Sequence, residues 1–229
     1  ATVSEPGALV INAKVLCDII RKASSESITF ETSGTSVSIT AGAAQYNIMG
    51  ISADEYPELP SVSGGIPVFI NQGVLQQMVM QTLFAVAEDE NQKMVHTGLK
   101  FELKMNQLRL VGVDGFRLAV RTETIKYDGE EISFIVPKKT IRELIKIIGS
   151  ETDKDVQISV GKRHIIFDVD NYSIISRLLE GDFLDYNAAI PKTSGTTVLI
   201  NTNDAISCIE RTIPVIENSA KNPIRCLFV

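Results

Sequence analysis

The sequence predicts an α+β protein assembled from a repeated β-α-β-β-β unit. The first observation is that a short β-rich run, then Asn or Pro, then a helical pattern occurs four times, roughly every 60 to 66 residues. The second is that apolar residues in these helical patterns recur at i, i+3 and i+4, the stripe of a helix that lies on a sheet. We therefore expect each helix to pack against the strands that follow it.

The first residues of each unit set the start of its helix. Asn is a good N-cap and Pro suits the first helical turn, so both residue types mark the same boundary. The markers are Asn12, Asn71, Pro137 and Asn201. The β-rich runs that precede the helices are Leu9–Asn12, Pro67–Asn71, Ser133–Pro137 and Val198–Asn201. The expected helices cover 13–22, 72–82, 138–148 and 202–212.

Strand-like runs follow the first three helices. They cover 27–32, 36–40 and 45–49 in the first unit, 99–104, 107–113 and 117–122 in the second, and 156–160, 164–169 and 172–178 in the third. Gly34, Gly42, Asn106 and Gly161 are expected at the turns between them. The fourth unit stops soon after its helix, so we expect the chain to be a fragment.

A longer period pairs the units. The aromatic and acidic segment 55–60 resembles 182–186, which lies close to two units further along. Two units are therefore expected to form one domain, with these segments as interdomain linkers.

Composition excludes several classes of protein. The chain is 44% hydrophobic and 22% charged with a net charge of -6, as in a soluble globular protein. No apolar run approaches the roughly 18 residues that span a bilayer, and no basic segment followed by an apolar one suggests a secretory signal. We therefore expect a cytoplasmic protein without membrane contact.

The cysteines are expected to be structural. Cys17, Cys208 and Cys226 are odd in number and widely spaced, which indicates neither a disulfide framework nor a zinc site. We expect them to be buried as small apolar residues. Cys208 aligns with Ile19, Met78 and Leu144 in the apolar helical stripe.

Catalysis fits the sequence poorly. His96 and His164 are the only histidines, and no nucleophile or phosphate-loop motif is present. We expect both histidines to be structural or exposed, the acidic runs 88–90 and 130–131 to be solvated, and no metal or cofactor to bind. The alternative, an enzyme on a duplicated α+β unit, would need a cleft of converging polar groups that no motif supplies.

The third helix carries a basic row. Lys138, Lys139, Arg142 and Lys146 are expected opposite the stripe of Leu144 and Ile145. Lys14, Arg21 and Lys22 repeat the tendency in the first helix. On charge alone this is either an ordinary solvated face or a row of phosphate contacts, which would bind DNA without reading its sequence.

The run 111–120 contains Asp114 and Gly115 between two apolar stretches. This pattern is typical of a hairpin turn and need be no more than that. However, Phe116 lies beside Arg117 in the turn, and an exposed aromatic residue next to an Arg is a typical anchor for a protein partner.

Together these segments resemble the bacterial sliding clamp family, the beta subunit of DNA polymerase III. The resemblance runs along the whole chain and is most specific at 113–120, where the family has a D-G-x-R-L-A run, at 135–139 and at 177–183. These three segments occur in the family's order and at its separations.

The resemblance implies the DNA-clamp fold, with two β-α-β-β-β units per domain, helices on the inner face and antiparallel sheets outside. It implies a processivity factor of the replicative DNA polymerase, without catalytic residues, whose head-to-tail homodimer ring encircles duplex DNA without sequence specificity. The basic helix residues would then face DNA. Polymerase and clamp-loader subunits would bind through linear peptide motifs, in the cytoplasm and in association with the nucleoid.

The resemblance also assigns domains and a binding cleft. Residues 1–61 would be the C-terminal half of domain I, 62–191 the complete domain II, and 192–229 the start of a truncated domain III. The cleft wall would comprise His96, Val113, Gly115, Phe116, Arg117, Leu118, Leu184, Ala188 and Ala189. An apolar peptide side chain would enter beside Phe116, Leu118 and Leu184, while Arg117 could bond to the peptide backbone. The chain departs from the family at His96, where leucine is common, at Leu184, where proline is frequent, and at Ala188, where some members have a basic residue.

Overall fold

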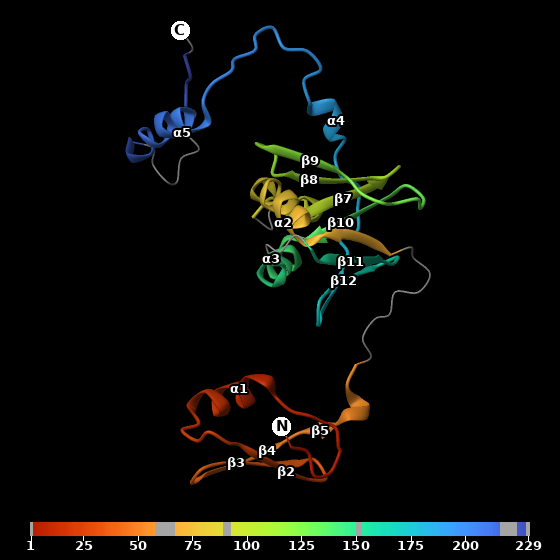
Figure 1. Cartoon of the computed structure of the whole chain (residues 1–229), viewed down its shortest axis with the longest axis vertical. Helices are drawn as coiled ribbons and strands as arrows, with labels where there is room; N and C mark the ends of the chain where they lie inside the picture. Colours follow the sequence, from red (N-terminus) through yellow and green to blue (C-terminus); the bar gives the residue numbers. More distant parts are fainter. Residues whose placement is uncertain (1, 58–66, 89–92, 150–152, 216–223, 228–229) are drawn as a thin grey trace.

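The computed structural model describes residues 2–57, 67–88, 93–149, 153–215 and 224–227. The N-terminal unit contains β1 (Leu9–Val10), α1 (Ala13–Lys22), β2 (Thr29–Ser33), β3 (Ser36–Ala41), β4 (Ala44–Met49), β5 (Ile51–Ser52) and the 3-10 turn η1 (Ala53–Glu55) (Figure 1). Strands β2, β3 and β4 form an antiparallel sheet, and β1 pairs with β5.

The central part of the chain contains two further copies of the unit. The first comprises β6 (Val68–Asn71), α2 (Gln72–Met80), the 3-10 turns η2 (Leu83–Ala85) and η3 (Met94–Thr97), β7 (Gly98–Lys104), β8 (Gln107–Val113) and β9 (Leu118–Thr124). The second comprises β10 (Ile132–Pro137), α3 (Lys138–Ile147), β11 (Asp155–Val160), β12 (His164–Val169) and β13 (Tyr172–Arg177). The short helix α4 (Tyr186–Ala189), α5 (Thr202–Glu210) and the 3-10 turn η4 (Ile213–Val215) follow.

The predicted helix starts are confirmed. The side-chain oxygen of Asn12 accepts a hydrogen bond from the Val15 amide at 3.1 Å, and that of Asn71 accepts one from the Val74 amide at 3.2 Å. Asn201 caps α5 in the same way, and Pro137 precedes α3 without a side-chain bond. These caps satisfy amide groups that have no partner within the helix.

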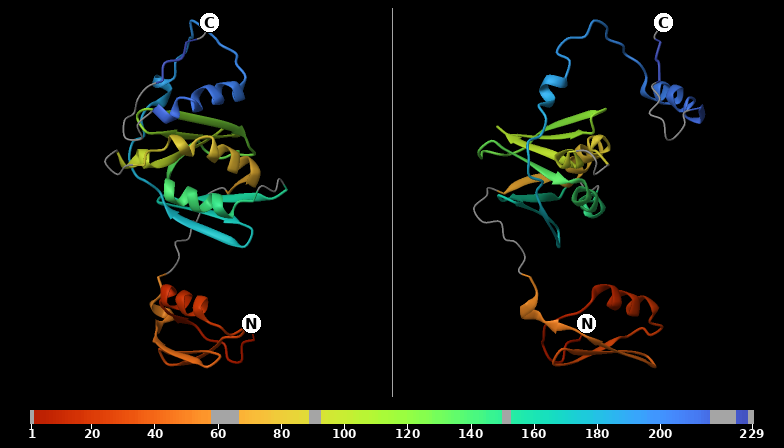
Figure 2. Two further views of the ribbon diagram at one scale, coloured as in Figure 1. Left: turned by 90° about the vertical axis from the view of Figure 1, so that its left-hand side faces the viewer. Right: turned by 180° about the vertical axis from the view of Figure 1, so that it is seen from behind.

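The two central units exchange their first strands. The sheets have the orders β10-β7-β8-β9 and β13-β12-β11-β6, so each first strand joins the edge of the sheet formed by the other unit's three strands. Val68 of β6 lies opposite Ile158 of β11, and Phe134 of β10 lies opposite Phe101 of β7. Helices α2 and α3 lie side by side on one side of the two sheets (Figure 2). Neither central unit is therefore a closed body by itself.

One hydrophobic core joins these two units. The predicted stripe is confirmed in α2, where Leu75, Met78 and Val79 are fully buried. In α3 Ile141 and Leu144 are fully buried and Ile145 packs against the core from its edge. The core includes the rings of Phe101, Phe134 and Phe167. The Phe101 ring contacts both others and stacks on that of Phe134 with 5.3 Å between centres. Each large apolar side chain buried in this way stabilises the fold by about 1.5 to 3 kcal/mol.

The predicted apolar stripe is not fully buried in the other two long helices, α1 and α5. In α1, Ile19 is buried but Ile20 is exposed, and no described residue of α5 is buried. The prediction that the cysteines are buried is wrong, because Cys17, Cys208 and Cys226 are all exposed. In α5 the stripe has no described sheet against which to pack.

The expected strand over Val198–Asn201 is also absent from the structure. Leu199 is 100% exposed, and this run pairs with no described strand. A β-rich run becomes a strand only when a partner strand satisfies its backbone hydrogen-bonding groups.

The other predicted strands lie within two residues of their expected bounds. The turns at Gly34, Gly42 and Asn106 adopt the positive φ expected there, and Gly161 turns through a bond from its amide to the His164 carbonyl.

Candidate functional site

The turn between β8 and β9 is held by one carboxylate. One oxygen of Asp114 accepts the amides of Phe116 and Arg117, each at 3.0 Å, and the other accepts the Arg117 guanidinium at 2.9 and 2.8 Å. Burial alone would raise the pKa of Asp114, but these hydrogen bonds outweigh it and hold the pKa below its ordinary value. Gly115 has a φ of 82°, which suits glycine. The turn is therefore fixed, and it presents Phe116 with 73% of its surface exposed.

A second aromatic residue lies beside this turn. The guanidinium carbon of Arg117 is 5.9 Å from the centre of the Phe84 ring, which is exposed on η2. The η2 segment can approach β8 closely because Gly112 has no side chain: a Cβ there would overlap the Thr82 carbonyl oxygen. We call Phe84, Phe116 and Arg117 the hairpin surface.

His96 lies at the same end of the sheet. It lies in η3, two residues before β7 begins. The pairing of Lys100 with Val111 and of Val113 with Leu118 brings the start of β7 to the β8-β9 turn. The His96 ring packs edge-on against Phe183 with 5.6 Å between centres. Burial lowers the pKa of His96, and nearby Lys93 lowers it further, so the imidazole is neutral at pH 7.

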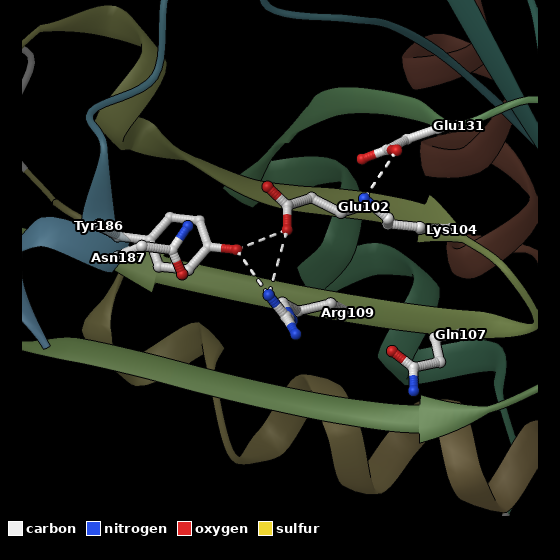
Figure 3. Close-up of a pocket in the computed structure, with 7 residues that line it drawn as sticks. All are labelled: Glu102, Lys104, Gln107, Arg109, Glu131, Tyr186 and Asn187. Carbon is white, nitrogen blue, oxygen red and sulfur yellow. Dashed lines mark hydrogen bonds and ion pairs between the residues drawn. The ribbon is translucent and has the colours of Figure 1, made fainter. Parts of the chain in front are cut away.

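The segment expected as an interdomain linker, 182–186, is instead fixed to the central sheet. The Lys100 ammonium lies 5.3 Å from the centre of the Phe183 ring and 5.5 Å from that of Tyr186. The Tyr186 hydroxyl donates to Glu102 at 2.5 Å and accepts from Arg109 at 3.2 Å. Figure 3 shows these three side chains converging from α4, β7 and β8. Only 2% of Tyr186 is exposed, so this segment is packed on the sheet.

A polar cavity of about 220 Å³ opens beside this network. Its lining residues, drawn in Figure 3, are Glu102, Lys104, Gln107, Arg109, Glu131, Tyr186 and Asn187. Acidic and basic side chains alternate around it, and Lys104 pairs with Glu131 at 2.9 Å. The lining therefore favours neither an anion nor a cation.

The predicted cleft wall comprises residues of the β8-β9 hairpin and of the segment that leads into α4. Val113 and Leu118 face each other at the hairpin, and Leu184 is half-buried in the segment fixed by Phe183. Ala188 and Ala189 are exposed on α4, which begins directly after Asp185.

The predicted basic residues of the helices are exposed, with one exception. Lys14, Arg21 and Lys22 are exposed on α1, and Lys139, Arg142 and Lys146 on α3. We call the last three the basic face of α3. The prediction for Lys138 is wrong, because only 8% of it is exposed and its ammonium donates to the Val86 carbonyl and to Glu88, both at 2.7 Å. It lies one turn before Ile141, on the buried stripe rather than opposite it.

Acidic side chains accompany the basic face of α3. Arg142 pairs with Glu88 at 2.8 Å, and Lys146 pairs with Glu143 at 2.8 Å. Lys139 has no acidic partner among the described residues. The basic face is thus partly neutralised by the chain itself.

The family is decided by the match of the sequence to two family models. The model described as "DNA polymerase III beta subunit, central domain" matches residues 69–185, and that described as the N-terminal domain of the same subunit matches residues 1–60. The chain belongs to the DNA polymerase III beta subunit family.

Similar proteins of the beta subunit family are known as sequences and as structures. The beta sliding clamp of Staphylococcus epidermidis is 31% identical over 224 residues, which cover 97% of this chain. A beta subunit structure from Eubacterium rectale matches with a TM-score of 0.84 and 31% identity, covering 95% of this chain and 60% of that one. The Bacillus subtilis sliding clamp structure matches with a TM-score of 0.86 and 27% identity, covering 96% and 58%.

These likenesses confirm the expected α+β DNA-clamp fold, with helices on one side of antiparallel sheets. The chain spans 59% of the length of the Staphylococcus epidermidis relative. The expected domain boundaries at 61/62 and 191/192 stay predictions.

Several residues that shape these beta subunit surfaces were not predicted. Phe84, Glu102 and Arg109 were not singled out and acquire their neighbours only through packing. Glu88 was expected only as part of a solvated acidic run, and Phe183 only as part of the segment 182–186. Tyr186 lay in the aromatic and acidic segment that had already been noticed, but its partners are some 80 residues away in the sequence. Among the described residues, no cluster of three or more His, Cys, Asp or Glu could hold a metal, and no helix is long and apolar enough to cross a membrane.

Proposed function

We propose that this chain acts as part of a sliding clamp, the processivity factor of the replicative DNA polymerase. In this role it would encircle duplex DNA without reading its sequence and tether the polymerase through a peptide-binding cleft. The observation that carries the proposal is the fixed hairpin surface, in a chain that belongs to the beta subunit family. A tether of this kind needs no catalytic group and no cofactor.

The hairpin surface suits an extended or turned peptide. An apolar peptide side chain would pack against Phe116, Leu118 and Leu184, which are exposed or half-buried. Arg117 uses Nε and Nη2 to bond Asp114, which leaves other guanidinium N–H groups for a peptide carbonyl. Because the Arg117 side chain is already held by Asp114 and Phe84, little of its conformational freedom would be lost on binding.

The exposed helix cations suit weak contacts with DNA. The whole chain carries a net charge of -6, so general attraction to DNA is not expected from its surface as a whole. Lys14, Arg21 and Lys22 on α1 and the basic face of α3 would supply phosphate contacts that are independent of sequence. A closed ring retains DNA by topology, so these contacts can remain weak while the protein slides.

The proposal extends to assembly and location. Residues 1–61 would complete domain I, 62–191 would form domain II and 192–229 would begin domain III of a longer protomer. Two such protomers would close head to tail into a ring, in the cytoplasm and at the nucleoid. Replicative polymerase and clamp-loader subunits would compete for the same peptide cleft.

The cleft is tested by peptide binding to the full-length protein. Arg117→Ala and Leu184→Asp should each weaken binding of a polymerase-derived peptide by about tenfold, as expected for central contacts of an interface. Arg177→Ala, which removes an exposed arginine from β13, is the matched control and should leave affinity unchanged. If the first two variants bind as tightly as the unaltered protein, Arg117 and Leu184 do not line the peptide cleft.

The DNA-facing role is tested by charge reversal. Replacing Lys139, Arg142 and Lys146 together by Glu should reduce loading onto DNA and processive synthesis. A control that reverses Lys104, Lys126 and Lys162 changes the net charge equally at exposed positions away from the helices. Equal loss in both proteins would show that net charge, rather than the basic face of α3, determines loading.

A further inference from the structure

Glu88 holds two cations of α3 with one oxygen. Its Oε1 lies 2.7 Å from the Lys138 ammonium and 2.8 Å from the Arg142 guanidinium. The Lys138 side chain is 10% exposed, whereas those of Glu88 and Arg142 are 64% and 54% exposed. The carboxylate therefore links a buried cation to a cation at the surface.

The buried cation fixes the position of Glu88. Lys138 also donates to the Val86 carbonyl at 2.7 Å, so its ammonium is held by the chain segment that leads to Glu88. The hydrogen bond from Lys138 holds the pKa of Glu88 below its ordinary value, and the charges of Lys138 and Arg142 act in the same direction. Glu88 is therefore an anchored anion at neutral pH.

An anchored carboxylate and a DNA phosphate offer Arg142 the same chemistry. Both present anionic oxygens that accept charge-assisted hydrogen bonds from a guanidinium. Glu143 differs from Glu88, because it pairs with Lys146 within one exposed helical turn, where both side chains can move apart at little cost. Of the three residues in the basic face of α3, Arg142 is thus the one with a fixed internal anion.

We propose that Glu88 is an intramolecular competitor of the DNA phosphate: it occupies Arg142 and lowers the affinity of the basic face of α3 for duplex DNA. This inference rests on the proposed function, because it requires that α3 faces DNA. Glu88 occupies Nη2 of Arg142, so a phosphate either displaces this carboxylate or binds the remaining N–H groups beside its negative charge, and Glu88 is in place again when the DNA moves on. Contacts at Arg142 therefore stay short-lived, as a protein that slides along DNA requires.

The first experiment removes the charge of Glu88 and keeps its shape. In Glu88→Gln the amide oxygen can still accept from Lys138, so the anchor is retained. Affinity of the full-length protein for a short labelled duplex, measured by fluorescence anisotropy, should rise about twofold to fivefold, the effect of releasing one exposed ion pair. The slope of log affinity against log salt should steepen by up to about 0.9, as expected for one added phosphate contact.

The matched control is Glu131→Gln. Glu131 pairs with Lys104 on the sheet, and its replacement changes the net charge by the same amount. Equal gains in affinity in Glu88→Gln and Glu131→Gln would overturn the proposal. So would a gain that persists when Arg142→Gln is added to Glu88→Gln, because the gain is expected to act through Arg142.

A further comparison leaves Glu88 unaltered, so it does not depend on the folding of the Glu88 variant. Arg142→Gln should weaken DNA binding less than Lys139→Gln, because Arg142 is already paired with Glu88, whereas Lys139 has no acidic partner among the residues that the structure describes. A larger loss at Arg142 would contradict the proposal. If the charge reversals on α3 weaken DNA binding but Glu88→Gln has no effect, only the inference about Glu88 fails. If none of these variants changes DNA binding, the DNA-facing role of α3 itself fails.

Discussion

The Tyr186 hydroxyl donates to Glu102 at 2.5 Å, and this bond joins α4 to β7. Glu102 also pairs with Lys100 at 2.7 Å, and Lys100 lies against the rings of Phe183 and Tyr186. One carboxylate thus organises the contacts that hold 182–189 on the sheet. The placement of Leu184 in the proposed cleft depends on these contacts.

Tyr186→Phe is expected to lower the free energy of unfolding by about 1 kcal/mol. The ring would remain buried, but Glu102 would lose a hydrogen-bond donor and Arg109 would lose an acceptor. The expected loss is smaller than the contribution of a fully buried hydrogen bond to a charged group. Denaturant unfolding followed by circular dichroism measures the change. Tyr172→Phe, at an exposed position, is the control and should change stability by less than about 0.5 kcal/mol. Equal effects of the two variants would contradict the role of the hydroxyl.

Glu102 is expected to make stability depend on pH. Burial acts to raise its pKa, but hydrogen bonds from Lys100 and Tyr186 outweigh burial and place the pKa below the ordinary value of 4.5. The unfolded chain therefore binds a proton at Glu102 more readily than the folded protein does. The stabilisation is complete above the pKa that Glu102 has in the unfolded chain. It is lost as pH falls through the lower pKa that Glu102 has in the folded protein.

The measurement compares the unaltered protein with Glu102→Gln. Because Gln does not titrate, the difference in free energy of unfolding should shrink as pH falls below 4.5. Unfolding titrations at a series of pH values supply the comparison. A difference that stays constant from about pH 6 to about pH 3 would show that Glu102 is not stabilised as a carboxylate.

The local pattern of the fold was predictable because its determinants are local. Asn12 and Asn71 cap their helices as expected, and Asn106 adopts the left-handed conformation that its place in a turn requires. Residue type and spacing alone specify such features. The exchange of β6 and β10 was not predicted, since strand periodicity does not identify the partner strand.

The candidate site was predictable to a smaller extent. Lys138 was expected on the helix face opposite the stripe of Leu144 and Ile145, but its ammonium meets Val86 and Glu88, which come from a distant part of the chain. Tyr186 finds Glu102 and Arg109 in the same way. Pairs of this kind depend on which strands become neighbours, and the sequence of one chain does not reveal that.

Gly112→Ala is expected to destabilise the fold by about 1 to 3 kcal/mol, the usual cost of adding a side-chain atom where there is no space. The new Cβ would overlap the Thr82 carbonyl oxygen and lie 3.1 Å from the Val86 side chain. Relief of this overlap would move η2, and with it Phe84, away from the hairpin. Thermal unfolding measures the loss. Gly195→Ala, where a Cβ would meet no atom within 4 Å, is the control. Equal melting temperatures of the two variants would show that η2 does not pack closely on β8.

The strand exchange predicts that neither central unit folds alone. In an isolated segment 67–131, β6 would lack β11, and β7 would lack β10 and the ring of Phe134 that stacks on Phe101 at 5.3 Å. Its sheet would expose a hydrophobic strand edge, which favours aggregation or disorder. We expect 67–131 and 132–191 to give the narrow amide NMR dispersion of unfolded chains when separate, and the spectrum of intact 67–191 when mixed. A dispersed spectrum and cooperative melting of 67–131 by itself would contradict this, because they would mean that its own four strands and helix suffice for a core.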